Sequence, residues 1–187
     1  MTKLPEEFII FDTEYTAWEG SNERGWNGPG EYREVIQIGA VRVRGLTEID
    51  SFLTYVKPVK NPVLSEYIIN LTGISQNDVD NQGLEYSEAQ SRFYAWCDNL
   101  PVGSFGSDAE VLRENSSWAG IDFPFPQSAF FVVREVFATA GVDASLYISS
   151  TIPLAFGATP PPSAHNAVND ARSILLAIQT AHNQGLI

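Results

Sequence analysis

Two carboxylates near the N-terminus have a spacing that could support metal chemistry. Asp12 and Glu14 stand two residues apart, directly after the apolar residues 8–11. A β-strand directs residues i and i+2 to the same face, so both side chains should project together from the rim of a sheet. Neighbouring like charges are unfavourable unless a cation neutralises them, and a divalent ion with oxygen ligands is a suitable partner. Acidic residues also commonly end a strand in a polar turn, so the pair alone leaves both interpretations open.

Two later segments carry further acids and a histidine. Asp108 follows the apolar residues 101–106 and opens a predicted helix, while His165 and Asp170 lie where a proline-rich connector meets the last predicted helix. Each could serve only its helix N-terminus, where an acid contributes a few tenths to ~1 kcal/mol. Taken singly, each of these residues is more simply explained by such a local role.

The elements that must position these residues can be read from the hydrophobic pattern. Strands are predicted at 8–12, 34–44, 48–57 and 102–106. Helices are predicted at 64–70, 75–80, from Ser87, from Asp108, at 132–140, in 146–156 and at 166–182, with a loop over 17–33. Three early strands followed by alternating helices and strands predict an α/β fold with a mixed β-sheet flanked by α-helices, in a single domain over residues 1–187.

Five segments in this order resemble the DEDDh-type 3′→5′ exonuclease superfamily, which is named for four acids and a histidine. The matching segments are 9–14 (IIFDTE), 34–41 (EVIQIGAV), 71–74 (LTGI), 104–108 (SFGSD) and 165–171 (HNAVNDA). Within the superfamily, the chain looks most similar to the branch of the histone-mRNA 3′-end exonucleases and their bacterial relatives. The resemblance covers nearly the whole chain and implies a ribonuclease-H-like fold, in agreement with the pattern of elements.

The resemblance also implies a mechanism. His165 would take the proton from the attacking water, and two divalent ions, Mg²⁺ or Mn²⁺, would neutralise charge on the scissile phosphate. The implied substrate is a single-stranded 3′ end, with RNA favoured over DNA, cut to nucleoside 5′-monophosphates. The implied metal ligands are Asp12, Glu14, Asp108 and Asp170. Thr13, through its backbone, and Ile74, as an apolar wedge, are the implied substrate contacts, although Ile74 could equally be a core residue.

Two residues are candidates for the third acid of the implied site. Relatives in this branch often place it three residues after the glycine, whereas Asp108 comes two after Gly106, and Glu110 is therefore an alternative on spacing. Asp108 is preferred because Val111 and Leu112 then fall three and four residues later, on the inward face of the helix.

The charge of the chain limits how it could hold nucleic acid. Eleven basic and 23 acidic residues give a net charge of −12, so the broad basic footprint of a nucleic-acid binder is missing. Bound metals and a few terminal nucleotides would therefore carry binding, with a shallow salt dependence. Trp18 and Trp26 in the long loop could stack on bases, although at least one of them is expected to anchor the loop.

Other features indicate compartment and competing functions. Residues 1–7 lack the pattern of a signal peptide, no apolar run approaches the ~20 residues of a membrane span, and Cys97 is a single cysteine, which together favour a cytoplasmic protein without membrane contact. Two alternatives to an exonuclease remain: a non-catalytic nucleic-acid-binding module and a proofreading subunit for a polymerase.

Overall fold

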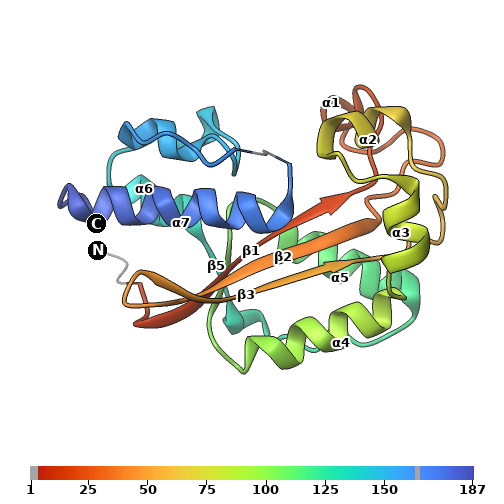
Figure 1. Ribbon diagram of the computed structural model, residues 1–187, viewed down its shortest axis with the longest axis horizontal. Helices are drawn as coiled ribbons and strands as arrows, with labels where there is room; N and C mark the ends of the chain where they lie inside the picture. The colour runs from red at the N-terminus through yellow and green to blue at the C-terminus, as the bar shows by residue number, and fades with distance from the viewer. Residues whose placement is uncertain (1–3, 163–164) are drawn as a thin grey trace.

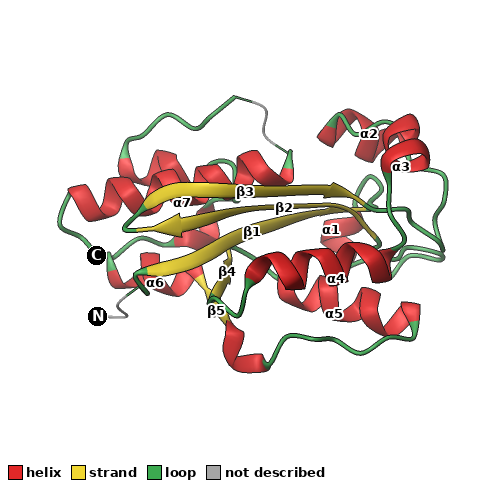
Figure 2. Cartoon of the chain, turned by 60° about the horizontal axis from the view of Figure 1, so that its bottom comes forward, coloured by secondary structure: helices red, strands yellow, loops and turns green. Residues whose placement is uncertain are grey.

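A five-stranded mixed sheet forms the centre of the molecule (Figures 1 and 2). The computed structural model describes residues 4–162 and 165–187. The strand order is β3-β2-β1-β4-β5, in which β1, β2 and β3 are antiparallel neighbours and β4 and β5 run parallel to β1. The strands are β1 Glu7–Tyr15, β2 Val35–Arg44, β3 Thr47–Tyr55, β4 Val102–Ser104 and β5 Phe130–Val132. This arrangement confirms the predicted mixed sheet.

Helices cover both faces of the sheet. The helices are α1 Ser21–Arg24, α2 Glu66–Thr72, α3 Gln76–Gln82, α4 Tyr86–Cys97, α5 Asp108–Ala119, α6 Val133–Thr139 and α7 Ala167–Asn183. α6 and α7 lie over one face of the sheet, and α4 and α5 lie over the other. α2 and α3 lie beside the end of the sheet at which β1 finishes (Figures 1 and 2). No helix of the described part of the chain is long and apolar enough to cross a membrane.

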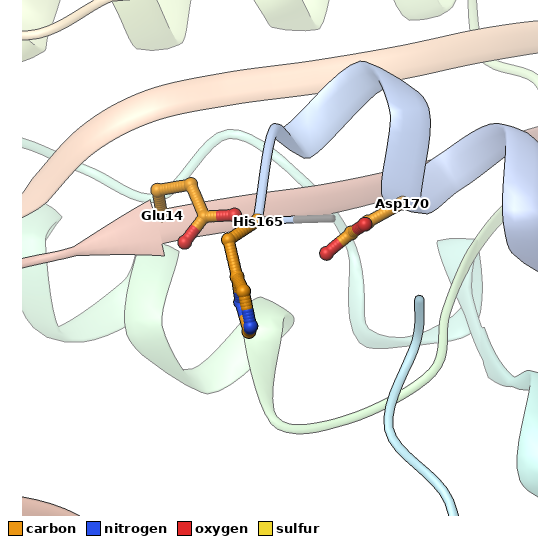
Figure 3. Close-up of side chains that lie close together, drawn as sticks. All are labelled: Glu14, His165 and Asp170. Carbon is orange, nitrogen blue, oxygen red and sulfur yellow. The ribbon is translucent and has the colours of Figure 1, made fainter. Parts of the chain in front are cut away.

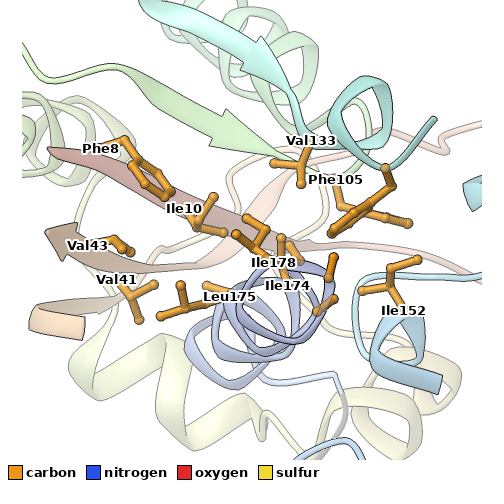
Figure 4. Packing of buried hydrophobic residues seen from close by; sticks show 14 of the residues in the cluster. Phe8, Ile10, Val41, Val43, Phe105, Val133, Ile152, Ile174, Leu175 and Ile178 are labelled. Atoms are coloured by element: carbon orange, nitrogen blue, oxygen red, sulfur yellow. The ribbon is translucent and has the colours of Figure 1, made fainter. Parts of the chain in front are cut away.

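The core follows this layering. Ile10 of β1 packs with the inward side chains Ile174, Leu175 and Ile178 of α7 on one face of the sheet (Figure 4). Ile9, its neighbour in β1, packs on the opposite face with residues of α4 and α5. Successive strand residues point to opposite faces, so a strand that is buried on both faces reads as the continuous apolar run seen at residues 8–11.

The structure differs from the sequence prediction in several elements. β1 extends to Tyr15 rather than ending at 12, and the predicted loop 17–33 contains the short helix α1. The strand β5 was missed, because three residues beside a proline-rich segment show no periodicity. Residues 146–156 form no single helix: 3₁₀ turns occupy Ala144–Leu146 and Ile152–Phe156. Between β2 and β3, Gly45 and Leu46 both have positive φ, as a two-residue hairpin turn of type I′ requires.

Candidate active site

The carboxyl ends of the three parallel strands meet at one cavity. β4 pairs with β1 only at Ile9 and Ile10, so the edge of β1 that faces β4 is free of a strand partner beyond that point. Asp12 and Glu14 lie on this last stretch of β1, still paired on the other side with β2. In open α/β sheets, ligands bind beyond the carboxyl ends of the strands. The ends of β1, β4 and β5 are therefore where a site is expected.

Asp108 is fixed against β1 by Thr13. The backbone N–H of Thr13 donates to Asp108 Oδ1 at 3.1 Å, and the Thr13 hydroxyl donates to the same oxygen at 2.8 Å. These bonds occupy the edge that β4 leaves open and bring Asp108, the first residue of α5, beside the N-terminal pair. Glu110 also borders the cavity, but its side chain is exposed and makes no such contact. The structure thus brings Asp108, rather than Glu110, into the buried group.

Asp170 and His165 are positioned by the start of α7. The side chain of Asn166 caps the helix by accepting the N–H of Asn169, and the N–H of Ala167 donates to Gln37 Oε1 of β2 at 2.9 Å. Gly39 permits this close approach, since a Cβ there would lie 2.1 Å from the Val168 nitrogen. A side chain at Gly39 would push the start of α7, and with it the acid and the histidine, away from the sheet.

Three potential ligand groups lie together at this point (Figure 3). Ligand atoms of Glu14, His165 and Asp170 lie within 4.8 Å of one another. His165 has φ 60°, a left-handed conformation that non-glycine residues rarely adopt and that often occurs at functional sites. Asp12 and Asp108 line the same cavity. All five residues predicted for the site therefore lie around one cavity.

The four carboxylates are buried and repel one another. Asp12, Glu14, Asp108 and Asp170 are each at most 8% exposed. Burial, followed by the charges of the other carboxylates, raises the pKa of Asp12 well above its usual range and that of Glu14 to about 8. Burial also raises the pKa of Asp170 to about 6 and that of Asp108, where the Thr13 bonds oppose the rise. Burial lowers the pKa of His165, which favours the neutral imidazole at pH 7.

Both the charges and the hydrogen bonds of this group fit a divalent cation. Asp170 Oδ2 accepts a bond from the Ser149 hydroxyl at 3.3 Å, whereas its buried Oδ1 has no partner among the described residues. A buried polar atom without a partner is unusual in a folded protein. Hard divalent ions prefer oxygen ligands and would satisfy that atom while neutralising the carboxylates.

The site opens into a cavity of about 800 Å³. Trp18, Tyr67 and Leu71 are among the residues that line it, as are Ile148 and Arg134. Sequence reasoning missed Tyr67, Leu71, Ile148, Ser149 and Arg134 as cavity residues. Ser149 and Arg134 have side chains that could contact a charged ligand, but neither lies in a sequence motif that would have marked it as a site residue.

The two tryptophans of the loop differ. Trp26 donates its indole N–H to the Thr16 carbonyl at 3.1 Å and packs edge-on against Tyr15, so it anchors the loop as expected for one of the pair. Trp18, like Trp26, lines the cavity and is partly exposed, but within the described residues no indole hydrogen bond ties it to the loop.

The predicted substrate contacts, Thr13 and Ile74, have different surroundings. Thr13 lines the cavity, but its N–H and hydroxyl are both engaged by Asp108. Ile74 is 3% exposed, packs with Ile68 and Val79, and is not among the cavity-lining residues. Its burial agrees with the core alternative, and its role as a wedge stays a prediction.

Metal should stabilise the folded protein in a pH-dependent way. The folded pKa values of Glu14 and Asp170, about 8 and about 6, exceed the unfolded values near 4. The folded state then binds more protons, so metal-free stability falls as pH rises from about 4 to about 8. We expect saturating Mn²⁺ to raise Tm by roughly 5–10 °C at pH 8 and by much less at pH 5, measured by calorimetry with an EDTA-treated reference.

The variant Asp12→Asn separates this effect from non-specific metal binding. It should reduce the Mn²⁺ shift, because an amide does not carry the negative charge that a bound divalent ion requires. Asp122→Asn, an exposed position outside the cavity, is the matched control and should behave as the wild type. An equal Mn²⁺ shift in Asp12→Asn and the wild type would contradict a metal site at these carboxylates.

Known proteins share both the sequence pattern and the fold. The family model described as exonuclease, RNase T, matches residues 9–177. "ERI1 exoribonuclease 2" of Xenopus laevis is 36% identical over 97 residues, which are 51% of this chain and 13% of the relative. The chain thus spans only a small part of the first curated relatives that it matches.

Solved structures extend the similarity to nearly the whole chain. The nuclease domain of 3′hExo, a DEDDh family member bound to rAMP, superposes with a TM-score of 0.82 at 22% identity, covering 97% of this chain and 94% of that one. E. coli Exonuclease I in complex with a dA16 oligonucleotide gives a TM-score of 0.70 at 15% identity, covering 97% and 42%. These likenesses show the ribonuclease-H-like exonuclease fold. With the family model matching residues 9–177, the chain belongs to the RNase T exonuclease family.

Proposed function

We propose that this protein is a metal-dependent 3′→5′ exonuclease that hydrolyses single-stranded nucleic acid, RNA in preference to DNA, to nucleoside 5′-monophosphates. The observation that carries the proposal is the group of four buried carboxylates with the half-buried His165 beside them, beyond the carboxyl end of β1. Within the described residues, Asp170 also has an oxygen without a hydrogen-bond partner. A module that only binds nucleic acid has no need of five such side chains at one point, since buried like charges destabilise the fold.

Each side chain has a role in this proposal. Asp12, Glu14, Asp108 and Asp170 hold two divalent ions, Mg²⁺ or Mn²⁺, which when bound supply the positive charge that stabilises the phosphate in the transition state. His165, kept neutral by burial, accepts the proton of the attacking water. Thr13 holds Asp108 in place through its two hydrogen bonds. Ser149 orients Asp170 by donating to Oδ2 and leaves Oδ1 free as a ligand.

The cavity supports a substrate of a few terminal nucleotides. Its volume of about 800 Å³ lies within the range of small-ligand sites rather than of a long groove. The ring of Trp18 offers a face on which a base can stack. The preference for RNA is supported by two similar proteins, one an exoribonuclease by name and the other bound to rAMP. The likeness to a nuclease bound to dA16 makes DNA the alternative that must be tested.

The test uses matched RNA and DNA strands of one sequence with free or blocked 3′ ends. We expect stepwise release of nucleoside 5′-monophosphates from free 3′ ends in Mg²⁺ or Mn²⁺, faster for RNA, and none in EDTA. Equal rates on blocked and free 3′ ends would rule out 3′→5′ polarity. A faster reaction on DNA would reverse the sugar preference but leave the exonuclease assignment in place.

A small footprint predicts a weak response to monovalent salt. Each phosphate contact on a single strand contributes about −0.7 to the slope of log K against log salt. With a net charge of −12 and a confined cavity, we expect a slope of about −2 or shallower, measured as KM for a short strand between 50 and 200 mM KCl at constant Mg²⁺. A slope steeper than about −4 would require a long basic track and contradict the small footprint.

A further inference from the structure

Arg134 is the one lysine or arginine among the described residues that line the cavity. Five acidic side chains border the same space, namely Asp12, Glu14, Asp108, Glu110 and Asp170. Among the charged groups of the lining, a polyanionic strand that enters this cavity therefore meets five carboxylates and one guanidinium. Beyond the metals of the proposed function, Arg134 is therefore the side chain that can offer a permanent positive charge to a phosphate.

The fold places Arg134 where a strand would pass. Arg134 is the second residue of α6, directly after β5, so it comes from the carboxyl end of the third parallel strand just as Asp12 and Glu14 come from that of β1. Val133 beside it is fully buried and packs in the same cluster as Phe105 (Figure 4). The backbone that carries Arg134 is thus anchored in the core, while its side chain is exposed at the cavity.

The guanidinium is oriented but not neutralised. Its central carbon lies 4.5 Å from the centroid of the Phe105 ring, in cation–π contact. Phe105 stands three residues before Asp108, so one loop positions both the acid and the arginine. Within the described residues, the ion pairs involve other arginines, such as Arg33 with Glu114 and Arg172 with Glu48, and none includes Arg134. Because no hydrogen bond from its side chain is formed within the described residues either, its donors are available to an anion.

We propose that Arg134 binds an internucleotide phosphate of the substrate strand. The proposal rests on the proposed function and adds a protein contact that orients the strand next to the carboxylates. A guanidinium matches phosphate through two parallel N–H donors, and the Phe105 ring reduces the number of orientations it can adopt before binding. Arg134 is in this view a substrate-binding residue that sets affinity for the strand rather than a proton donor or acceptor.

The first experiment compares Arg134→Gln and Arg134→Lys with Arg113→Gln in the full chain. Arg113 is the matched control, because its guanidinium also lies over a phenylalanine ring, Phe123 at 4.9 Å, but bonds Gln127 and lies outside the cavity lining. KM and kcat are measured on a short single strand at several salt concentrations. Thermal unfolding of each variant reports whether the fold is intact.

Arg134→Gln should raise KM by about tenfold with a smaller change in kcat, as expected for loss of one charged hydrogen bond. The salt slope should become shallower by about 0.7, because one phosphate contact is lost. Lysine should restore part of both effects, and Arg113→Gln should match the wild type. Equal KM and equal slope in Arg134→Gln and Arg113→Gln would overturn the inference, as would a change confined to kcat.

A second experiment identifies the phosphate. Strands with one neutral methylphosphonate at the first, second or third linkage from the 3′ end compete against cleavage of an unmodified labelled strand. For the wild type, a methylphosphonate at one of these linkages should weaken competition. For Arg134→Gln, the same replacement should have no effect. A first-linkage effect assigns the scissile phosphate, and a later one assigns an upstream phosphate. If each methylphosphonate weakens competition by the same factor for Arg134→Gln as for the wild type, Arg134 does not bind phosphate.

Direct binding keeps this inference separate from the proposed function. Fluorescence anisotropy of a 5′-labelled strand in EDTA at low salt measures affinity without turnover. A wild type that binds the strand but never cleaves it, even with metal, contradicts the exonuclease proposal. The ratio of the strand affinities of Arg134→Gln and Arg113→Gln still shows whether Arg134 contacts a phosphate.

Discussion

Asp108→Asn should lower turnover by on the order of 10²–10³-fold, whereas Glu110→Gln should leave it within about twofold of the wild type. Asparagine keeps the shape of the side chain and can still accept the bonds from Thr13, so the loop stays in place. It removes a buried negative charge that the proposed metals require. Glu110 is exposed, so its charge is screened by solvent and its replacement costs little.

The pair is tested by initial rates on a labelled strand at saturating Mg²⁺, with Tm measured in parallel. Both residues lie in the first turn of α5, so any general effect of charge at that helix end is common to both variants. Substantial activity in Asp108→Asn together with inactivity of Glu110→Gln would show that the site is built on the other acid. Loss of activity in both would indicate that the first turn of α5 contributes as a whole.

His165→Ala should reduce kcat by about 10²–10⁴-fold while leaving most of the Mn²⁺-induced rise in Tm. The reason is that His165 is proposed to accept a proton, whereas the carboxylates hold the metal. Its ring nevertheless lies within 4.8 Å of ligand atoms of Glu14 and Asp170, so a direct metal contact is a real alternative. Asp170→Asn is the comparison variant, because it should lose both activity and the rise in Tm.

The two measurements on His165→Ala separate these roles. If the variant loses the Mn²⁺ shift as completely as Asp170→Asn, His165 is a ligand. If it keeps both the shift and near-normal kcat, the histidine is neither ligand nor base. Only loss of turnover with retained metal binding agrees with proton transfer. The left-handed backbone of His165 also means that alanine is strained there, so Tm in EDTA must be recorded for each variant.

The sequence predicted those parts of the site that strand and helix periodicity control. Asp12 and Glu14 share a strand face, and Asp108 opens a helix whose buried residues Val111 and Leu112 fix its rotation. The inward face of α7, with Ile174 and Ile178 fully buried, is likewise as expected. In each case the pattern extends over enough residues for a period to be recognised, and burial of one face is what the period encodes.

The remaining parts depend on contacts between distant segments, which periodicity does not encode. β5 has three residues and follows a proline-rich stretch, so neither the strand nor the placement of Arg134 after it could be predicted. Ser149 lies between two 3₁₀ turns, where no repeat exists. The bonds from Thr13 to Asp108 join residues 95 positions apart, and the sequence indicated Thr13 only as a substrate contact.

The measurement that tests the central claim most directly is the product analysis of a 3′-labelled single strand incubated with wild-type protein and with Asp12→Asn, each in Mn²⁺ and in EDTA. The proposed site predicts labelled nucleoside 5′-monophosphate as the first product for the wild type in Mn²⁺ alone, and essentially none for Asp12→Asn. Labelled mononucleotide at similar rates from both proteins, or from the wild type in EDTA, would contradict metal-dependent exonuclease chemistry at these carboxylates.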